Sequence, residues 1–393
     1  MPWQFSPALM WAGLAVLSSQ PARAQTTLRV LTPAAMPAGQ LLYVAGSFNG
    51  WQPAAAGYTL ARQADGSYQL TLPVTAQGPQ EFKFTRGSWA TGEADAQFRP
   101  VANRRADFGA APATLTFQIA AWQDQRPVSA ASAKAHTRAA NVRVLADSFR
   151  LPQLPGRNRR VWLYLPPGYA RQPTRRYPVV YLQDGQNVFD EATAFAGEWG
   201  VDEMLNQLAA GPAKITQAIV VAIDHGGERR LDEYSPWANA EYHKGGEGDR
   251  YTDFLARTLK PYIDAHYRTR PEAVHTAVAG SSMGGLIALY AGLKYPQVFG
   301  RVGVFSPAIW FAKDSLLAYA GHRPAPLASR FYFVAGPAES ETMLPLMVAV
   351  RRQLLASGVA PGHIRLQAPA DGQHAEWFWR REFGPAYRWL LAE

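Results

Sequence analysis

Residues 26–120 carry short runs of β-branched and aromatic residues, separated by turns that contain Gly, Pro and Asp. Four of these runs, at 41–45, 68–72, 81–85 and 115–119, predict strands. The segments between them have no helical periodicity. Several short strands at this spacing favour a small all-β domain of the immunoglobulin-like sandwich type.

From residue 141 onward, continuous apolar runs alternate with segments of helical periodicity. The apolar runs predict strands at 160–165, 178–182, 218–223, 274–278, 302–305, 331–334 and 364–366. The periodic segments predict helices at 201–210, at 251–267 and from about 286 to Pro296. Because strands that are apolar throughout are buried on both faces, we expect a mostly parallel sheet covered by helices on both faces.

The first 24 residues have the pattern of a secretory signal peptide. Residues 8–17 form an apolar run, and Ala22-Arg23-Ala24 follows as an A-x-A cleavage site. The run is too short for a membrane span, which takes about 20 apolar residues. We therefore expect a periplasmic or secreted protein with no integral membrane segment once the signal is removed. The alternative interpretation of the run is a buried N-terminal helix.

Composition sets the remaining boundaries and excludes several kinds of site. A stretch rich in Ala, Ser, Thr and Gln at 121–140 predicts a linker between a β domain at 25–120 and an α/β domain at 141–393. The chain has no Cys, which excludes disulfides, thiolate nucleophiles and cysteine metal sites. The net charge of +9 comes mostly from scattered Arg and forms no basic helical stripe, so we expect no nucleic-acid partner.

The turn after the 274–278 strand carries candidate chemistry. Gly280-x-Ser282-x-Gly284 matches G-x-S-x-G, the turn that exposes a nucleophilic serine between a strand and a helix. Ser282 is the predicted nucleophile. The backbone N–H of Met283, at the start of the helix, is a predicted oxyanion donor. The alternative is a Gly-rich turn around a buried, inert serine.

The two last predicted strands supply partners for that serine. In α/β-hydrolases the chain order is Ser, then acid, then His. His374 follows the last strand and is the predicted general base. Glu339, after the strand before it, is the leading candidate for the acid, and Glu341 and Asp371 are its rivals.

The loop after the 178–182 strand is expected to complete the oxyanion hole. Gly185 permits a tight turn there, so the backbone N–H of Gln186 is the predicted second donor. No cluster of His and carboxylate residues has metal-ligand spacing, and this chemistry needs neither a metal nor another cofactor.

Five segments resemble a serine esterase family that includes enterobactin-type siderophore esterases, feruloyl and acetyl xylan esterases, and mycolyl transferases. They are residues 164–169, 177–187, 233–236, 280–285 and 306–310. The resemblance implies an α/β-hydrolase fold and ester substrates. By position it implies that Ser282 is the nucleophile, His374 the base and Glu339 the acid, in a G-x-x-E pattern that begins at Gly336.

The β domain resembles starch-binding carbohydrate-binding modules at residues 45–51, 82–89 and 103–104. The resemblance implies that Trp51 and Trp89 stack on sugar rings. Phe98 stands near where that family tends to keep a second tryptophan. Alternatively, both tryptophans fill a core or an interdomain contact, and the domain is an appendage that binds no sugar.

Together these patterns predict a secreted or periplasmic serine carboxylic-ester hydrolase that works through an acyl-enzyme. Its expected substrates are acyl or feruloyl esters of carbohydrates, either small molecules or polysaccharides. Siderophore (enterobactin-type) esters are the alternative substrate class, and acyl transfer to a sugar is the alternative reaction. A glycan-binding scaffold with an inactive hydrolase domain is the non-enzymatic alternative. Trp199, Tyr234 and Trp310 are expected either to line the pocket or to pack in the core.

Overall fold

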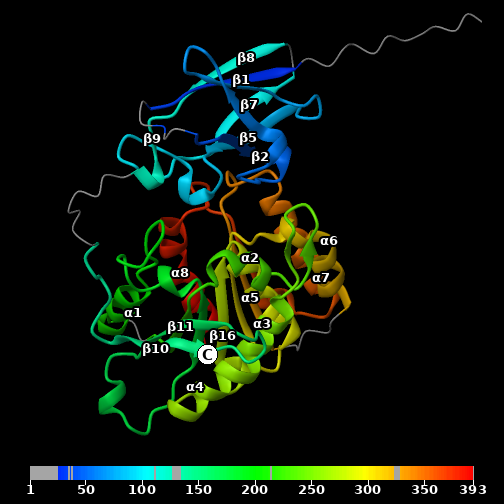
Figure 1. The fold of residues 1–393 in the computed structure, drawn as a ribbon. Helices are drawn as coiled ribbons and strands as arrows, with labels where there is room; N and C mark the ends of the chain where they lie inside the picture. The colour runs from blue at the N-terminus through cyan, green and yellow to red at the C-terminus, as the bar shows by residue number, and fades with distance from the viewer. Residues whose placement is uncertain are drawn as a thin grey trace, which may run out of the picture. The chain divides into compact units, whose positions relative to one another are not determined.

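The computed structural model describes residues 25–33, 36, 39–109, 112–125, 134–212, 215–322 and 328–392 (Figure 1). The chain divides into two compact units, Met1–Ser129 and Ala130–Glu393. The predicted signal peptide lies outside the described residues. Each unit has its own hydrophobic core and is described by itself.

The first unit is built on a seven-stranded sheet in the order β7-β5-β2-β3-β4-β1-β8. Neighbouring strands are antiparallel except β1 and β8, which run parallel. The four predicted strands correspond to β2, β4, β5 and β8. The bounds are β1 (Thr26–Leu31), β2 (Leu42–Gly46), β3 (Thr59–Arg62), β4 (Tyr68–Thr71), β5 (Gly78–Thr85), β7 (Arg104–Phe108) and β8 (Ala113–Gln118), with a short pair β6 (Glu93–Ala94) and β9 (Ala121–Trp122) beside them.

Alternating positions on these strands make the core of the first unit. Leu28 and Val30 on β1 and Phe82 and Phe84 on β5 are fully buried, as the period of two in a strand requires. Thr27, Arg29 and Lys83, between or beside them on the same strands, are only partly buried. The all-β architecture of this unit therefore follows from its alternating sequence.

The stretch expected as a linker, 121–140, is tied into both units at its ends. Trp122 is fully buried in the core of the first unit, so the β structure extends past residue 120. On the other side, Thr137 Oγ1 donates a hydrogen bond to Glu198 at 2.7 Å, and Ala139 N–H donates to Asp202 at 2.6 Å. The composition of this stretch, rich in Ala and Ser, did not reveal that its two ends form these contacts.

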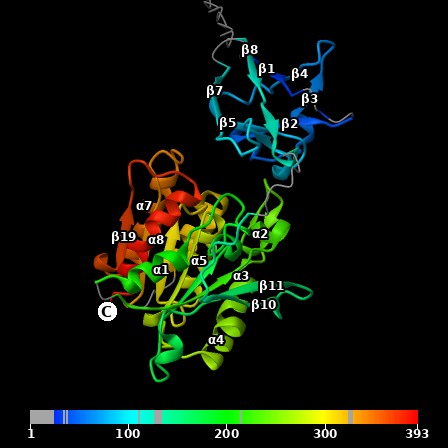
Figure 2. The same ribbon diagram turned by 90° about the vertical axis from the view of Figure 1, so that its left-hand side faces the viewer.

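The second unit is built on an eight-stranded sheet in the order β10-β11-β13-β12-β16-β17-β18-β19. The pairs β10–β11 and β11–β13 are antiparallel, and every pair from β13 to β19 is parallel. Figure 2 looks onto this sheet, with β19 at one edge and β10 at the other. The bounds are β10 (Val142–Arg150), β11 (Asn158–Tyr164), β12 (Val179–Gln183), β13 (Ile219–Ile223), β16 (Thr276–Ser281), β17 (Arg301–Phe305), β18 (Arg330–Val334) and β19 (Ile364–Gln367).

Helices cover both faces of this sheet, as predicted. In Figure 1, α1 and α8 lie to the left of the sheet, and α5, α6 and α7 lie to its right. The bounds are α1 (Val201–Ala210), α2 (Arg230–Glu233), α3 (Gly248–Phe254), α4 (Lys260–His266), α5 (Met283–Lys294), α6 (Lys313–His322), α7 (Met343–Ala356) and α8 (Glu376–Leu390). None of the described helices is long and apolar enough to cross a bilayer.

Strand β12 shows why the central strands read as continuous apolar runs. Val179 and Tyr181 belong to the core on the α5 side, and Val180 and Leu182 belong to the core on the α1 and α8 side. Each such side chain contributes about 1.5–3 kcal/mol when fully buried. A strand of this kind can therefore be stable only between two helical layers.

The helix predicted over 251–267 begins three residues earlier and is interrupted. Between α3 and α4 the segment Leu255–Leu259 is a π-helix. Pro261 follows within the first turn of α4, where it cannot donate a backbone hydrogen bond to the preceding turn. Hydrophobic periodicity alone does not predict such a local change from an α-helix to a π-helix.

Candidate active site

The sharp turn between β16 and α5 presents Ser282. This residue has φ 56° and ψ −123°, and its N–H donates to Phe305 O at 2.9 Å on the neighbouring strand β17. A Cβ on Gly280 would lie 2.6 Å from Gly284 O, and one on Gly284 would lie 2.8 Å from Asp184 Oδ2. Glycine at 280 therefore lets the strand and the helix come this close, and glycine at 284 leaves room for the Asp184 side chain.

Three non-glycine residues with positive φ gather at this edge of the sheet. Asp184, Ser282 and Ser306 each follow directly after a strand, β12, β16 and β17 in turn, with φ of 57°, 56° and 41°. These strands are adjacent and parallel, so their carboxyl ends meet. Such conformations cost about 1–3 kcal/mol each and are concentrated at functional sites.

The loops after β18 and β19 bring Glu339 and His374 together. His374 Nδ1 lies 2.9 Å from Glu339 Oε2, and the side chains of the base and the acid are 42% and 1% exposed. A buried carboxylate on Nδ1 fixes the imidazole orientation and leaves Nε2 free for a proton donor. The remaining oxygen, Glu339 Oε1, accepts from Gly336 N–H at 2.6 Å and from Ser306 Oγ at 2.8 Å.

Two further residues support this pair and were missed by the sequence analysis. Ser306 Oγ accepts a hydrogen bond from Trp379 Nε1 at 2.8 Å while donating to Glu339. The Trp379 ring also contacts the His374 ring edge to face, with centroids 5.0 Å apart. Trp379 therefore connects α8 to both the acid and the base.

The acid loop and the base loop pack through their glycines. A Cβ on Gly336 would overlap the carbonyl oxygen of Gly372, and one on Gly372 would lie 2.6 Å from Gly336 Cα. Backbone contact this close holds the two loops in register. It is the physical reason for a glycine three residues before Glu339.

The two rival acids lie in other surroundings. Asp371 forms an ion pair with Arg381, through both of its carboxylate oxygens. Glu341 is exposed and lines a pocket that neither Glu339 nor His374 lines. Of the three candidate acids, the structure places Glu339 against His374.

Ser282 stands at the same edge, half-buried, and shares no hydrogen bond with His374 in the part of the chain that the structure describes. Backbone hydrogen bonds hold the neighbouring turns at this edge: Ser282 N–H donates to Phe305 O on β17, and Ser306 N–H donates to Val334 O on β18 at 2.7 Å. Contacts between nucleophile and base are often long in unliganded enzymes and tighten when substrate binds.

The predicted oxyanion donors belong to adjacent turns. Gln186 lies in the 3₁₀ turn Gly185–Asn187 after β12, which is the parallel neighbour of β16. Its carbonyl accepts from Thr193 Oγ1 at 2.7 Å, and its side-chain oxygen accepts from His225 N–H at 3.3 Å. Met283 is the first residue of α5, so its N–H has no partner within the helix.

Charged side chains surround this edge of the sheet. Arg230 donates two hydrogen bonds to Asp184, at 2.7 and 2.8 Å. Burial raises the pKa of Glu376, while the charges of His374 and Arg230 oppose that increase. Burial has the opposite effect on His225: it lowers the pKa of the imidazole, which favours the neutral form.

No group of three or more His, Asp and Glu in the described ranges is arranged to hold a metal ion.

The aromatic candidates separate into two groups. Trp199 and Tyr234 are buried in the two cores of the second unit, whereas Trp310 is 45% exposed and lines a pocket. In the first unit, Trp89 is exposed and Trp51 is half-buried; their ring centroids are 6.2 Å apart, and both residues lie outside the core cluster.

A family model described as Putative esterase matches residues 153–386, which is more than half of the chain. The chain belongs to the Putative esterase family. The family match and the esterase relatives described below identify this protein as a carboxylic-ester hydrolase, so the prediction of an ester hydrolase is confirmed. The predicted α/β-hydrolase fold is confirmed as well.

Curated relatives match different parts of the chain. An uncharacterized Bacillus subtilis protein, YbbA, is 27% identical over 248 residues, 60% of this chain and 94% of YbbA. The iron(III) enterobactin esterase of Dickeya dadantii is 29% identical over 246 residues, 59% of this chain and 52% of that enzyme. An α-amylase of Niallia circulans is 36% identical over 110 residues, 28% of this chain and 8% of the amylase. Relatives that match 34–43% of this chain are named as an endo-1,4-β-xylanase/feruloyl esterase, a siderophore triacetylfusarinine C esterase and an iron(III) salmochelin esterase.

Solved structures agree on the fold. The enterobactin esterase of Shigella flexneri, solved in the presence of 2,3-dihydroxy-N-benzoyl-glycine, superposes with a TM-score of 0.50 at 19% identity. The match covers 90% of this chain and 87% of that structure. At this identity the likeness supports the architecture alone.

Proposed function

We propose that this esterase uses Ser282 as its nucleophile, His374 as its general base and Glu339 as the acid that orients the base. The observation that carries the proposal is the 2.9 Å contact between His374 and the buried Glu339, beside a strained serine at the carboxyl ends of adjacent strands. The buried acid and the accessible base have the exposures that this chemistry requires.

In the first half-reaction, His374 takes the proton from Ser282 Oγ as that oxygen bonds to the ester carbonyl carbon. The negative charge that develops on the carbonyl oxygen is met by the N–H groups of Met283 and Gln186. His374 then gives its proton to the departing alcohol as the ester C–O bond breaks. Water repeats the sequence on the acyl-enzyme, releases the acid and restores Ser282.

We propose acyl or feruloyl esters of carbohydrates as the substrates. Support comes from the likeness of a 110-residue stretch to part of an α-amylase, and from a relative named as an endo-1,4-β-xylanase/feruloyl esterase. Siderophore esters are the second candidate, because other relatives are named as siderophore esterases. Transfer of the acyl group to a sugar needs the same three residues and differs only in the acceptor.

A panel of esters tests the substrate proposal. Feruloylated sugars, acetyl xylan and a catecholate siderophore are compared by kcat/KM, with free acid measured against acyl-sugar to separate hydrolysis from transfer. We expect the carbohydrate esters to have the highest kcat/KM and free acid to be the product. A siderophore preferred by tenfold or more, the order of one good contact, would favour the second candidate.

We further propose that the first unit is an immunoglobulin-like carbohydrate-binding module. Trp51 and Trp89 form an adjacent surface pair of the kind that stacks on sugar rings. Retention on starch, xylan or cellulose, lost in the Trp51→Ala, Trp89→Ala double variant, is the expected result. Equal retention of both proteins would show that this tryptophan pair does not bind the polysaccharide, and retention of neither would favour a unit that binds no sugar. The apolar run and A-x-A sequence before residue 25 support export to the periplasm or beyond.

A further inference from the structure

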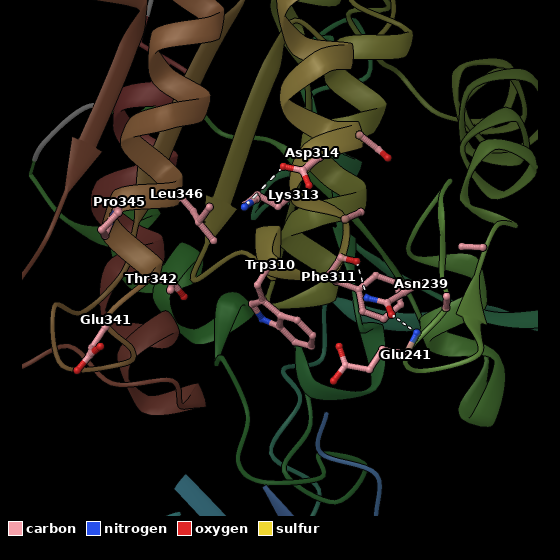
Figure 3. Close-up of a pocket in the computed structure, with 14 residues that line it drawn as sticks. Asn239, Glu241, Trp310, Phe311, Lys313, Asp314, Glu341, Thr342, Pro345 and Leu346 are labelled. Atoms are coloured by element: carbon pink, nitrogen blue, oxygen red, sulfur yellow. Dashed lines mark hydrogen bonds and ion pairs between the residues drawn. The ribbon is translucent and has the colours of Figure 1, made fainter. Parts of the chain in front are cut away.

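A hollow with a volume of about 860 Å³ lies next to two of the loops that carry the candidate active site. Four segments form it, namely the turn after β14 (Ala238–Asn239), the 3₁₀ segment Ile309–Ala312, the start of α6 and the start of α7. Figure 3 shows the Trp310 ring between α7 on one side and Asn239 and Glu241 on the other. The size is that of a site for a small ligand.

Two loops join this hollow to the proposed catalytic residues, none of which lines it. Ala308 N–H donates to Ser282 O at 3.0 Å, and Trp310 stands two residues further along the same loop. Glu341 stands two residues after Glu339. Two residues span at most about 7 Å of chain, so the hollow borders the site at which the ester is cleaved.

Trp310 is fixed in place with much of its ring in solvent. Its ring contacts Tyr242, with centroids 5.4 Å apart, and Phe311, at 5.8 Å. Asn239 Nδ2 donates to Phe311 O at 2.8 Å and holds the neighbouring turn against this segment. A rigid indole that stays 45% exposed in a hollow offers a flat apolar face to a ligand.

The charge of the lining is opposite to that of the chain. Glu241, Asp314 and Glu341 contribute three carboxylates against the single ammonium of Lys313, in a chain of net charge +9. Such a lining repels anions, including a trianionic ferric tris-catecholate. Carboxylates and the hydroxyls of the lining, among them that of Thr342, are good partners for uncharged O–H groups.

We propose that this hollow, the Trp310 pocket, binds an uncharged sugar ring in the alcohol part of the ester. The apolar C–H face of the sugar stacks on Trp310, and its hydroxyls bond to the surrounding carboxylates and hydroxyls. This inference rests on the proposed function and goes further by selecting neutral carbohydrate esters over anionic siderophores.

Trp310→Ala and Trp310→Phe test the stacking contact. The substrates are a monoacetylated methyl glucoside and p-nitrophenyl acetate, which has no sugar. For Trp310→Ala we expect the ratio of kcat/KM for the sugar ester to that for p-nitrophenyl acetate to fall roughly 3- to 10-fold, through KM. Trp310→Phe should restore most of the ratio. Trp377→Ala is the matched control, since Trp377 is equally exposed at 45% and does not line the pocket.

Glu341→Gln tests the charge. We expect the wild type to prefer an acetylated methyl glucoside over the matching glucuronoside, and Glu341→Gln to reduce that preference severalfold. Asp147→Asn, with a carboxylate 79% exposed on β10, is the control.

Two results would overturn the proposal. One is an unchanged ratio of sugar-ester to p-nitrophenyl acetate kcat/KM in Trp310→Ala. The other is a wild type that prefers acetylcholine over its neutral isostere 3,3-dimethylbutyl acetate more strongly than it prefers the glucoside over the glucuronoside, which would make the pocket a cation site. Either result leaves the proposed catalytic residues standing, because Ser282→Ala tests those separately.

Discussion

Ser282→Ala is expected to lower kcat for p-nitrophenyl acetate by at least about 10³-fold. The substitution removes the atom that would form the acyl-enzyme, while the β16–α5 turn keeps its backbone hydrogen bonds. What activity remains would come from the oxyanion donors and substrate binding alone. Initial rates at saturating substrate give kcat directly.

Ser281→Ala is the matched control for this change. Ser281 precedes the nucleophile, is buried at the end of β16 and plays no part in the proposed chemistry. Its variant should keep kcat within a few-fold of the wild type. A Ser282→Ala protein as active as Ser281→Ala would remove the nucleophile assignment.

Glu339→Gln is expected to lower kcat by about 10²- to 10⁴-fold. The amide carries no charge to stabilise the imidazolium that forms when His374 takes a proton. It also places an N–H₂ group where the carboxylate accepts from Gly336, Ser306 or His374, so one of these donors faces another donor. Loss of the charge and of the fixed tautomer both slow proton transfer.

Variants of the two rival acids, Glu341 and Asp371, serve as the controls for Glu339→Gln. Glu341→Gln and Asp371→Asn should each leave kcat for p-nitrophenyl acetate within about threefold of the wild type, because neither carboxylate contacts His374. If one of these variants lost more activity than Glu339→Gln, the acid would have been assigned wrongly. Circular dichroism and the unfolding midpoint of each variant check that the fold is intact.

The sequence predicted the α/β architecture well because its strands are buried on both faces. In β12, four consecutive apolar residues divide between two cores, and this pattern has no other stable solution than a covered parallel sheet. The G-x-S-x-G turn could also be predicted from the sequence, because Gly280 lies so close to Gly284 that a side chain at position 280 would not fit. The order of strands then put the acid and base loops at one edge.

Side-chain partners across the fold could not be predicted in this way. Ser306 and Trp379 are 73 residues apart, and nothing in their local sequence indicates that they share a hydrogen bond beside Glu339. The choice among Glu339, Glu341 and Asp371 likewise depends on which carboxylate the loop turns inward. The position of Arg381, which forms an ion pair with Asp371, is known only once α8 is in place.

Covalent labelling is the most direct test of the account, because the central claim is that one serine is activated as a nucleophile. The full-length protein is treated with a fluorophosphonate, and the adduct is located by mass spectrometry of peptides. We predict a single phosphonylated residue, Ser282, whose labelling rate falls in His374→Ala and in Glu339→Gln. Labelling at another serine, or an adduct that forms equally fast in Ser282→Ala, would contradict the account.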